Sequence, residues 1–363
     1  MIRILELLIA LVLVVVIFVL VGVALPSHRY VSNTTETSRP QPVVFDMLTG
    51  FKRYRDWSAL TKQDPKIQFS FSGPDSGKGA HVDYASAIPG IGNGSLQVDE
   101  VVPGEKIVYT VSNDDYGTDK TMTFRFKKVG NQKLSVEITE SYDVDYGFNL
   151  LGRYAGLYVT RSVGDPMKAG LTNLNNLLAT IPKFDYTQLV VAPKIVQVPA
   201  ENLLVAASNA KRSDNVIQST METQEKWLRQ VIAKNGLEAT GPVRIATINF
   251  GADNYAFDVD LPVRKVGEVS TAALPTLDVK MVGDEAKWVK YVQTPAVSAV
   301  TTVYTGHQAQ LPAIREAMKA WAATHAVTVG DRPYDIYTKG VAASFTLDGE
   351  FTLYWPLKAA GSK

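Results

Sequence analysis

The chain of 363 residues contains no cysteine, and this absence excludes several kinds of site. Without thiols there can be no disulfide, no thiolate nucleophile and no cysteine-ligated metal. The four histidines are scattered, and none forms the H-x-x-x-H pair of many zinc sites. We therefore expect no metal site and no bound cofactor.

An excess of charge of one sign is also lacking. The 37 basic and 36 acidic residues give a formal net charge of +1, and neither sign forms a long run. Nucleic-acid binding requires a basic face. We therefore expect no nucleic-acid partner.

The sequence does contain one long hydrophobic run, at its start. Leu7 to Leu25 are nineteen residues without a charge, which is roughly 28 Å of helix and matches a bilayer's hydrocarbon core. A cleaved signal peptide is the alternative, because Gly22-Val23-Ala24 loosely resembles a cleavage site, but signal peptides have shorter apolar cores of about 7–15 residues. We predict a transmembrane anchor over residues 1–27. The globular part would then lie in the periplasm or another extracytoplasmic space, although basic residues on both sides of the span leave the orientation open.

Residues 28–182 are mostly predicted strand. Apolar residues recur at every second position, as in Met122, Phe124 and Phe126, which is the period of a half-buried strand. Tight turns between the runs predict antiparallel pairing. The clearest runs are 67–71, 80–87, 95–102, 106–112, 121–128 and 133–142. A closing helix is predicted to start at Asp165 as its cap and Pro166 as its first residue.

This order of elements resembles the SRPBCC (START-like, polyketide cyclase-like) superfamily. The resemblance is carried by "YRDWSAL" (54–60), "FSGPDSGKGAHVDY" (71–84), "GNGSLQVDEVVPGEKIVYTV" (92–111) and the closing helix. It implies a helix-grip fold, in which a long helix packs on a curved antiparallel sheet, with a cavity for hydrophobic ligands. His81 and Asp83 share a strand face. They are either an acid–base pair facing the groove or part of a solvated polar face.

The second half of the chain repeats itself. "FDVDLPV" (257–263) and "FTLYWPL" (351–357) lie 94 residues apart, as do Trp227 and Trp321. Pro199-Ala200 and Pro295-Ala296 also correspond. After a linker at 183–192, we predict a duplicated strand-strand-helix-strand-strand unit over 193–358, with halves 193–265 and 277–358 and a tail at 359–363. The second half would begin with the strand "LDVKMV" (277–282).

This region resembles the gyrase-inhibitor-like (GyrI-like) effector-binding domain. The resemblance is carried by "YTGH" (304–307), "GDRPYDIY" (330–337) and "FTLYWPL". It implies a cleft between the two halves with an acidic residue that meets cationic ligands or acts as an acid–base group. Here that residue is Asp335, an aspartate in place of the usual glutamate, and it would lie among Tyr334, Tyr337, Tyr354 and Trp355. No helix-turn-helix precedes the domain, so a role in transcription is not implied.

The expected ligand-binding residues are therefore Asp335, Tyr337, Trp355, Tyr304 and His307, and Asp335 is the candidate catalytic group. Each has a plainer alternative, since a strand carboxylate often faces solvent and strand aromatics often fill cores.

The sequence as a whole predicts an α+β protein of two domains behind an anchor. The predicted function is to bind small lipophilic or amphipathic molecules at the cell envelope, with a hydrophobic or cationic ligand. The alternatives are a hydrolase that uses the cleft carboxylate and an adaptor with a protein partner.

Overall fold

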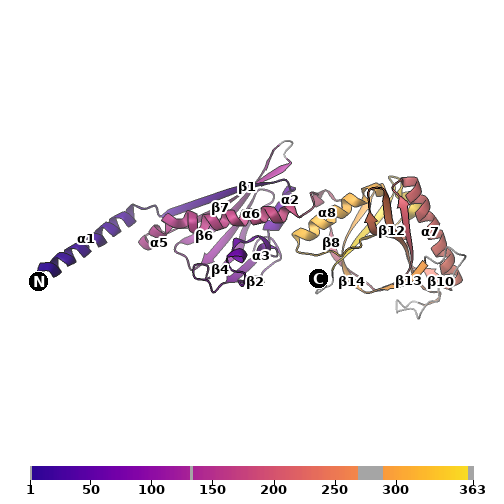
Figure 1. The fold of residues 1–363 in the computed structure, drawn as a ribbon, viewed down its shortest axis with the longest axis horizontal. Coiled ribbons are helices and arrows are strands. Elements are labelled where there is room, and N and C mark those ends of the chain that lie inside the picture. The colour runs from indigo at the N-terminus through magenta and orange to yellow at the C-terminus, as the bar shows by residue number, and fades with distance from the viewer. Residues whose placement is uncertain (1, 131–133, 269–288, 359–363) are drawn as a thin grey trace. The chain divides into compact units, whose positions relative to one another are not determined.

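The computed structural model describes residues 2–130, 134–268 and 289–358, and the chain forms two compact units (Figure 1). Unit 1 consists of Met1–Lys183 with Thr324–Ala326, and unit 2 consists of Phe184–Ala323 with Val327–Lys363. Each unit contains one curved antiparallel sheet with helices, which confirms the α+β class.

The sheet of unit 1 has seven strands in the order β1-β7-β6-β5-β4-β3-β2. Six of them match the predicted runs to within a few residues, whereas β1 was not predicted. It joins the sheet at the edge beside β7, where it pairs over its whole length. The strands are β1 (His28–Thr37), β2 (Gln68–Ser72), β3 (His81–Ala85), β4 (Asn93–Val102), β5 (Lys106–Asn113), β6 (Thr118–Val129) and β7 (Ser135–Asp145).

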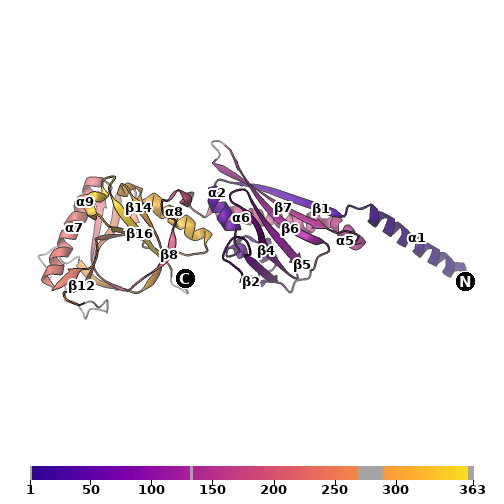
Figure 2. The same ribbon diagram turned by 180° about the vertical axis from the view of Figure 1, so that it is seen from behind.

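Helices cover one face of this sheet. The segment between β1 and β2 forms α2 (Gln41–Leu48), α3 (Tyr54–Trp57) and α4 (Ala59–Gln63). After β7 the chain forms α5 (Leu150–Ala155), η2 (Gly156–Tyr158), η3 (Thr160–Gly164) and α6 (Asp165–Ala179). Helix α6 crosses in front of the strands in Figure 1 and behind them in Figure 2.

The closing helix α6 begins at Asp165, within one residue of the predicted start, but Asp165 is not its cap. Asp165 has helical φ and ψ, and its side chain caps nothing, because the π-helical turn η3 runs directly into α6. A proline ring within a helix collides with the carbonyl four residues earlier and lacks an N–H to donate. The wider turn of a π-helix just before Pro166 relieves both problems, so the helical run continues through the proline.

The apolar helix α1 (Ile2–Ala24) is tied to the rest of unit 1 at its carboxyl end. Arg153 on α5 donates from Nη1 to the carbonyl oxygens of Val23 (2.8 Å) and Leu25 (3.1 Å). Tyr154 stacks on Phe18 at 4.5 Å and donates to its carbonyl oxygen. The Arg153 bonds satisfy carbonyls at the end of α1, where a helix leaves such groups without intrahelical donors.

Unit 2 contains a nine-stranded sheet in the order β13-β9-β12-β11-β15-β16-β14-β8, with β10 beside β12. The strands are β8 (Lys194–Val198), β9 (Glu201–Lys211), β10 (Leu237–Ala239), β11 (Arg244–Phe250), β12 (Asn254–Lys265), β13 (Val289–Thr294), β14 (Val297–Thr305), β15 (Tyr334–Tyr337) and β16 (Glu350–Pro356). The helical elements are η4 (Tyr186–Gln188), α7 (Asp214–Lys234), η6 (Gln308–Gln310), α8 (Leu311–Thr324) and α9 (Gly340–Ser344).

Helices α7 and α8 share one core with the sheet. Met221 of α7 and Met318 of α8 belong to the same buried cluster as Phe257 of β12 and Leu353 of β16. The last two belong to the repeated "FDVDLPV" and "FTLYWPL" segments. The two copies of the repeated sequence therefore form two strands, β12 and β16, that contribute side chains to the same core.

Two strands of unit 2 pair outside their own predicted half. β8 pairs with β14, and β13 pairs with β9, so the strands before Pro199 and Pro295 lie beside the other half of the region. Only two residues separate β8 from β9, and two separate β13 from β14. Each pair therefore diverges at its proline instead of closing as a hairpin. The predicted strand at 277–282 lies outside the described residues.

Candidate functional site

A cavity of about 150 Å³ lies in unit 1 between the sheet and its covering helices. Its walls come from α3, α4, the start of α6 and the inward faces of β3 to β7. An apolar cavity of about this size accepts a benzene ring. The largest side chains that line it are those of Tyr54, Trp57, Tyr84, Met122, Tyr142 and Met167.

Glu140 is the buried one of two acidic residues that line the cavity. It lies on β7 in phase with the buried residues Ile138 and Tyr142, and it pairs with Phe124 across β6. The residue is 3% exposed, and its Oε2 atom has no hydrogen-bond partner among the described residues. Burial raises the pKa of the Glu140 carboxyl to about 8, because no neighbouring cation offsets the loss of hydration.

A second buried polar atom at this cavity has no partner among the described residues. The indole Nε1 of Trp57, a residue 3% exposed, makes no hydrogen bond there. The ring packs edge-on against Tyr54 at 5.0 Å and Phe124 at 6.3 Å, which fixes its position in the wall. The cavity wall therefore contains one buried donor and one buried acceptor without partners among the described residues, an arrangement that native cores rarely leave unexplained.

Glu140 was not among the predicted site residues, although the sequence contains a signal for it. Val136 and Ile138 alternate as the apolar face of a strand, and the same two-residue period places Glu140 and Tyr142 on that face. A charged residue in phase with a buried strand face indicates either an ion pair or a functional group.

The polar pair His81 and Asp83 lies outside the cavity. Nε2 of His81 is 3.1 Å from Oδ1 of Asp83, but the Asp83 side chain is 58% exposed. The cavity side of β3 instead carries Val82 and Tyr84, both buried. The structure thus selects the solvated polar face over an acid–base pair in the groove.

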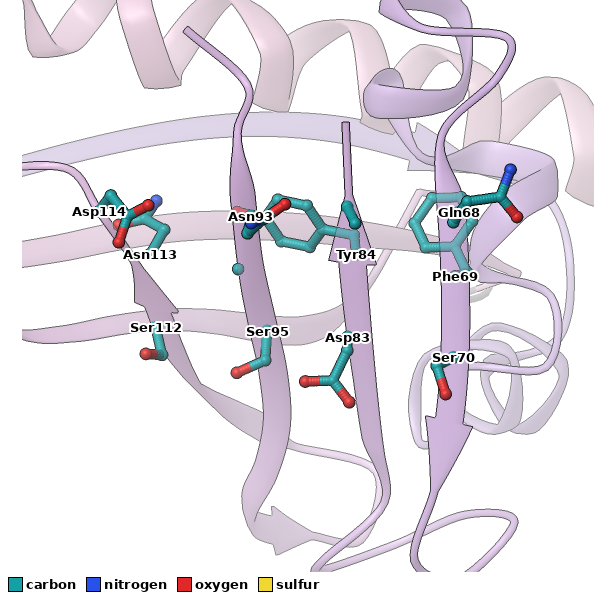
Figure 3. A pocket seen from close by; sticks show the side chains of 12 residues that line it. Gln68, Phe69, Ser70, Asp83, Tyr84, Asn93, Ser95, Ser112, Asn113 and Asp114 are labelled. Carbon is teal, nitrogen blue, oxygen red and sulfur yellow. The ribbon is translucent and has the colours of Figure 1, made fainter. Parts of the chain in front are cut away.

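Asp83 also lines an open polar pocket at the β2 end of the sheet. Ser70, Asp83, Ser95 and Ser112 lie side by side across four strands, in direct register (Figure 3). The side chains are short, and the pocket is open to solvent. We assign it no chemistry.

In unit 2 a cleft of about 400 Å³ lies where the starts of α7 and α8 meet β11, β12 and β15. Its lining includes Tyr255, Gln308, Arg315 and Tyr337. The Tyr337 hydroxyl donates to Oε1 of Gln308 at 3.0 Å. Of the five predicted ligand-binding residues, Tyr337 is the one that lines this cleft.

Asp335 lies beneath the cleft and does not reach it. Its residue exposure is 0%, and its Oδ2 forms an ion pair with Nη2 of Arg315. Burial raises the pKa of Asp335, and the Arg315 guanidinium opposes that rise. The alternative of a solvent-facing strand residue is thereby excluded. A cationic ligand would meet the Arg315 side chain before it met Asp335.

The other predicted residues of this region have structural partners. Trp355 is 9% exposed and donates from Nε1 to the carbonyl oxygen of Gly330 at 2.7 Å. His307 precedes η6 and accepts from the amide of Ala309 through Nδ1. Tyr304 stacks on the buried ring of Phe351 at 5.9 Å. Contact of any of them with a ligand stays a prediction.

Tyr334 and Tyr354 do not surround Asp335, contrary to the expectation. Successive strand residues point to opposite faces, so Tyr334 lies on the face of β15 away from Asp335. There it stacks on Tyr354 at 5.1 Å and on Arg244 at 4.7 Å. The guanidinium of Arg244 is also 2.7 Å from Glu201 and 3.6 Å from Asp260. Burial raises the pKa of Asp260 to about 7, and Arg244 opposes the rise.

No group of three or more metal-ligating side chains occurs among the described residues.

Comparison with known proteins gave matches among solved structures. No family model and no curated protein matches the chain. The C-terminal domain of EcmrR, which has a GyrI-like effector-binding fold, is 12% identical over 47% of this chain and all of its own, with a TM-score of 0.36. A hydrolase from Listeria innocua is 13% identical over 46% of this chain and 91% of its own, with a TM-score of 0.32.

Norcoclaurine synthase from Thalictrum flavum, a START-like protein solved with dopamine and hydroxybenzaldehyde, is 14% identical over 44% of this chain and 90% of its own. Its TM-score is 0.33. These identities and scores are too low to carry an argument about activity.

Proposed function

We propose that the protein binds small lipophilic or amphipathic molecules, and that the cavity of unit 1 is the binding site. The observation that carries this proposal is a partly open cavity whose lining is rich in apolar and aromatic side chains. The buried carboxyl of Glu140 and the indole N–H of Trp57 in its wall have polar atoms without a partner among the described residues. Ligand sites commonly combine apolar walls with a few placed polar groups in this way.

Helix α1 supports a location at a membrane. Ile4–Ala24 has a mean hydropathy of 3.5 and is long and apolar enough to cross a bilayer, as a signal sequence also can be. We propose that it stays as an anchor, with the globular part in the periplasm or another extracytoplasmic space. The full chain should then remain with membranes after a high-salt wash, with Met1 as its first residue. An amino terminus near Leu25 would show a cleaved signal.

We further propose that unit 2 is a duplicated GyrI-like domain. The order β8, β9, α7, β11, β12 returns as β13, β14, α8, β15, β16, and the repeated sequence phrases fall on β12 and β16. The cleft carboxylate of the hydrolase alternative is engaged by Arg315. No specific observation therefore favours hydrolysis over binding.

The test uses the full chain in lipid nanodiscs and a variant that fills the cavity. Gly170 on α6 lines it, and a Cβ there would lie 3.9 Å from Ala59 and 4.0 Å from Trp57. Gly170→Met should abolish binding of the small neutral probe 4-fluorobenzyl alcohol, followed by fluorine NMR. The matched control is Ala169→Met, on the exposed side of the same helix. If the wild type binds no more probe than Gly170→Met does, the proposal fails.

A further inference from the structure

We propose that the cavity of unit 1 accepts the ammonium group of a small aromatic or apolar amine, with the Glu140 carboxylate as its partner. This inference rests on the proposed function and narrows the ligand to molecules with a cationic nitrogen. It is carried by the position of one side chain and by the chemistry of the walls around it.

Glu140 interrupts the apolar face of β7. The residue lies between Ile138 and Tyr142 on a buried strand face, where a leucine would continue the apolar pattern. Its Oε2 atom is buried and without a partner among the described residues. Because such an acceptor costs stability as long as it stays unpaired, a donor from a bound molecule is the missing element.

The walls favour a cation over an anion. Asp115 is the second carboxyl-bearing residue of the lining, and none of the cavity-lining residues is a lysine, arginine or histidine. Lys120 lies on the neighbouring strand β6, but its ammonium is directed into the β5–β6 turn. It donates there to Asn113 Oδ1 and to the carbonyl oxygen of Asp115, both at 2.6 Å. Lys120 thus offsets the exposed carboxylate of Asp115 at the edge of the cavity, whereas an anionic ligand inside it would face the carboxyl of Glu140 without a neighbouring cation.

The size and the aromatic walls limit the rest of the ligand. A volume of about 150 Å³ accommodates one ring with a short arm. The lining contains four aromatic rings, and a ring that meets a cation with its face adds cation–π attraction to the charge of Glu140. These rings belong to Tyr54, Trp57, Tyr84 and Tyr142. The free indole N–H of Trp57 provides a place for one acceptor atom on the ligand.

The experiment compares two probes that differ in one group, 4-fluorobenzylamine and 4-fluorobenzyl alcohol, on the full chain in lipid nanodiscs. It is run at pH 8.5, because burial raises the pKa of the Glu140 carboxyl to about 8 and the carboxyl is mostly ionised only above that value. Fluorine NMR titrations are corrected with empty nanodiscs. We expect the wild type to bind the amine about ten- to a hundred-fold more tightly, the usual effect of a charge-assisted hydrogen bond. Glu140→Gln keeps the size of the side chain and removes its charge, so the ratio of amine to alcohol affinity should fall to about one. Glu137→Gln, on the opposite face of β7, is the matched control.

The outcomes separate this inference from the proposed function. If the wild type binds both probes equally well, the amine assignment is overturned, and this result needs no variant to fold. If both probes bind and Glu140→Gln changes neither affinity, the amine assignment again fails while the binding function stands. If neither probe binds the wild type, the proposed function is itself wrong.

Discussion

Replacement of Glu140 by glutamine should make unit 1 more stable, and increasingly so as the pH rises. Burial raises the pKa of this carboxyl from 4.5 to about 8 in the folded protein. Between these two pH values the folded state keeps a proton that the unfolded state has released. Stability is therefore highest below pH 4.5, falls as the pH rises, and is constant above about pH 8.

The magnitude follows from the gap between the two pKa values. Each pH unit in that interval costs about 1.4 kcal/mol, so the wild type should lose about 4 kcal/mol between pH 5 and pH 8. Water entry and relaxation around a buried charge reduce such penalties. We therefore expect Glu140→Gln to gain at least about 2 kcal/mol on the wild type over this range.

The absence of cysteine provides a reporter that is specific to unit 1. Val98 on β4 is fully buried, so a Val98→Cys thiol becomes reactive only when this unit unfolds. Urea series from pH 5 to pH 8.5, each followed by a short thiol-labelling pulse at one fixed pH, give the free energy of unfolding. The reporter is placed in both the wild type and Glu140→Gln.

Other titrating groups cancel in this comparison, because both chains contain them. Those in or near the cavity are Tyr54, Tyr84, Tyr109, Tyr142, Asp115 and Lys120. Parallel loss of stability in the two chains as the pH rises would refute the argument that Glu140 is a buried neutral acid. Glu137→Gln should follow the wild type at every pH.

Three further predictions concern other parts of the fold. Asp335→Asn leaves Arg315 as an uncompensated buried charge and should destabilise unit 2 by about 3 kcal/mol in urea unfolding; a change below about 0.5 kcal/mol, typical of surface positions, would place Asp335 at the surface. Gly170→Ala should raise the stability of unit 1 by about 0.5–1 kcal/mol, because the added Cβ meets only ordinary contacts in the middle of α6; a loss of stability would mean that α6 lies closer to Trp57. A fragment of residues 184–358 should unfold cooperatively, whereas one that ends at Lys265 should not, since it lacks β13 and all of β14 to β16; circular dichroism during heating distinguishes the two.

The regular parts of the fold could be predicted because their sequence patterns are local. The two-residue alternation of residues such as Met122, Phe124 and Phe126 reports directly which side chains a sheet buries. β1 was missed because its serine, asparagine and threonine side chains alternate without an apolar signal, and it is defined by its pairing with β7. The exchanged positions of β8 and β13 are likewise long-range pairings that no local pattern encodes.

The candidate site was predicted less well than the fold. The family resemblance predicted Asp335 as the site residue. Whether its carboxyl contacts a ligand or an internal cation depends on a side chain that is distant in sequence. Here that side chain is Arg315, on a different element. Glu140 shows the reverse case. The two-residue period of β7 already places Glu140 on the buried face of the strand. That its carboxyl has no basic neighbour depends on how distant segments pack, which the sequence pattern does not show.

The attachment of α1 to Arg153 affects how the protein would encounter a ligand of the proposed kind. Three residues separate α1 from β1, which allows a reach of about 10 Å. With α1 in a bilayer, this short connection would hold unit 1 close to the lipid surface. Molecules that partition into that layer are far more concentrated there than in bulk water. Capture then becomes a two-dimensional encounter governed by effective concentration, and even a weak intrinsic affinity would keep the cavity occupied.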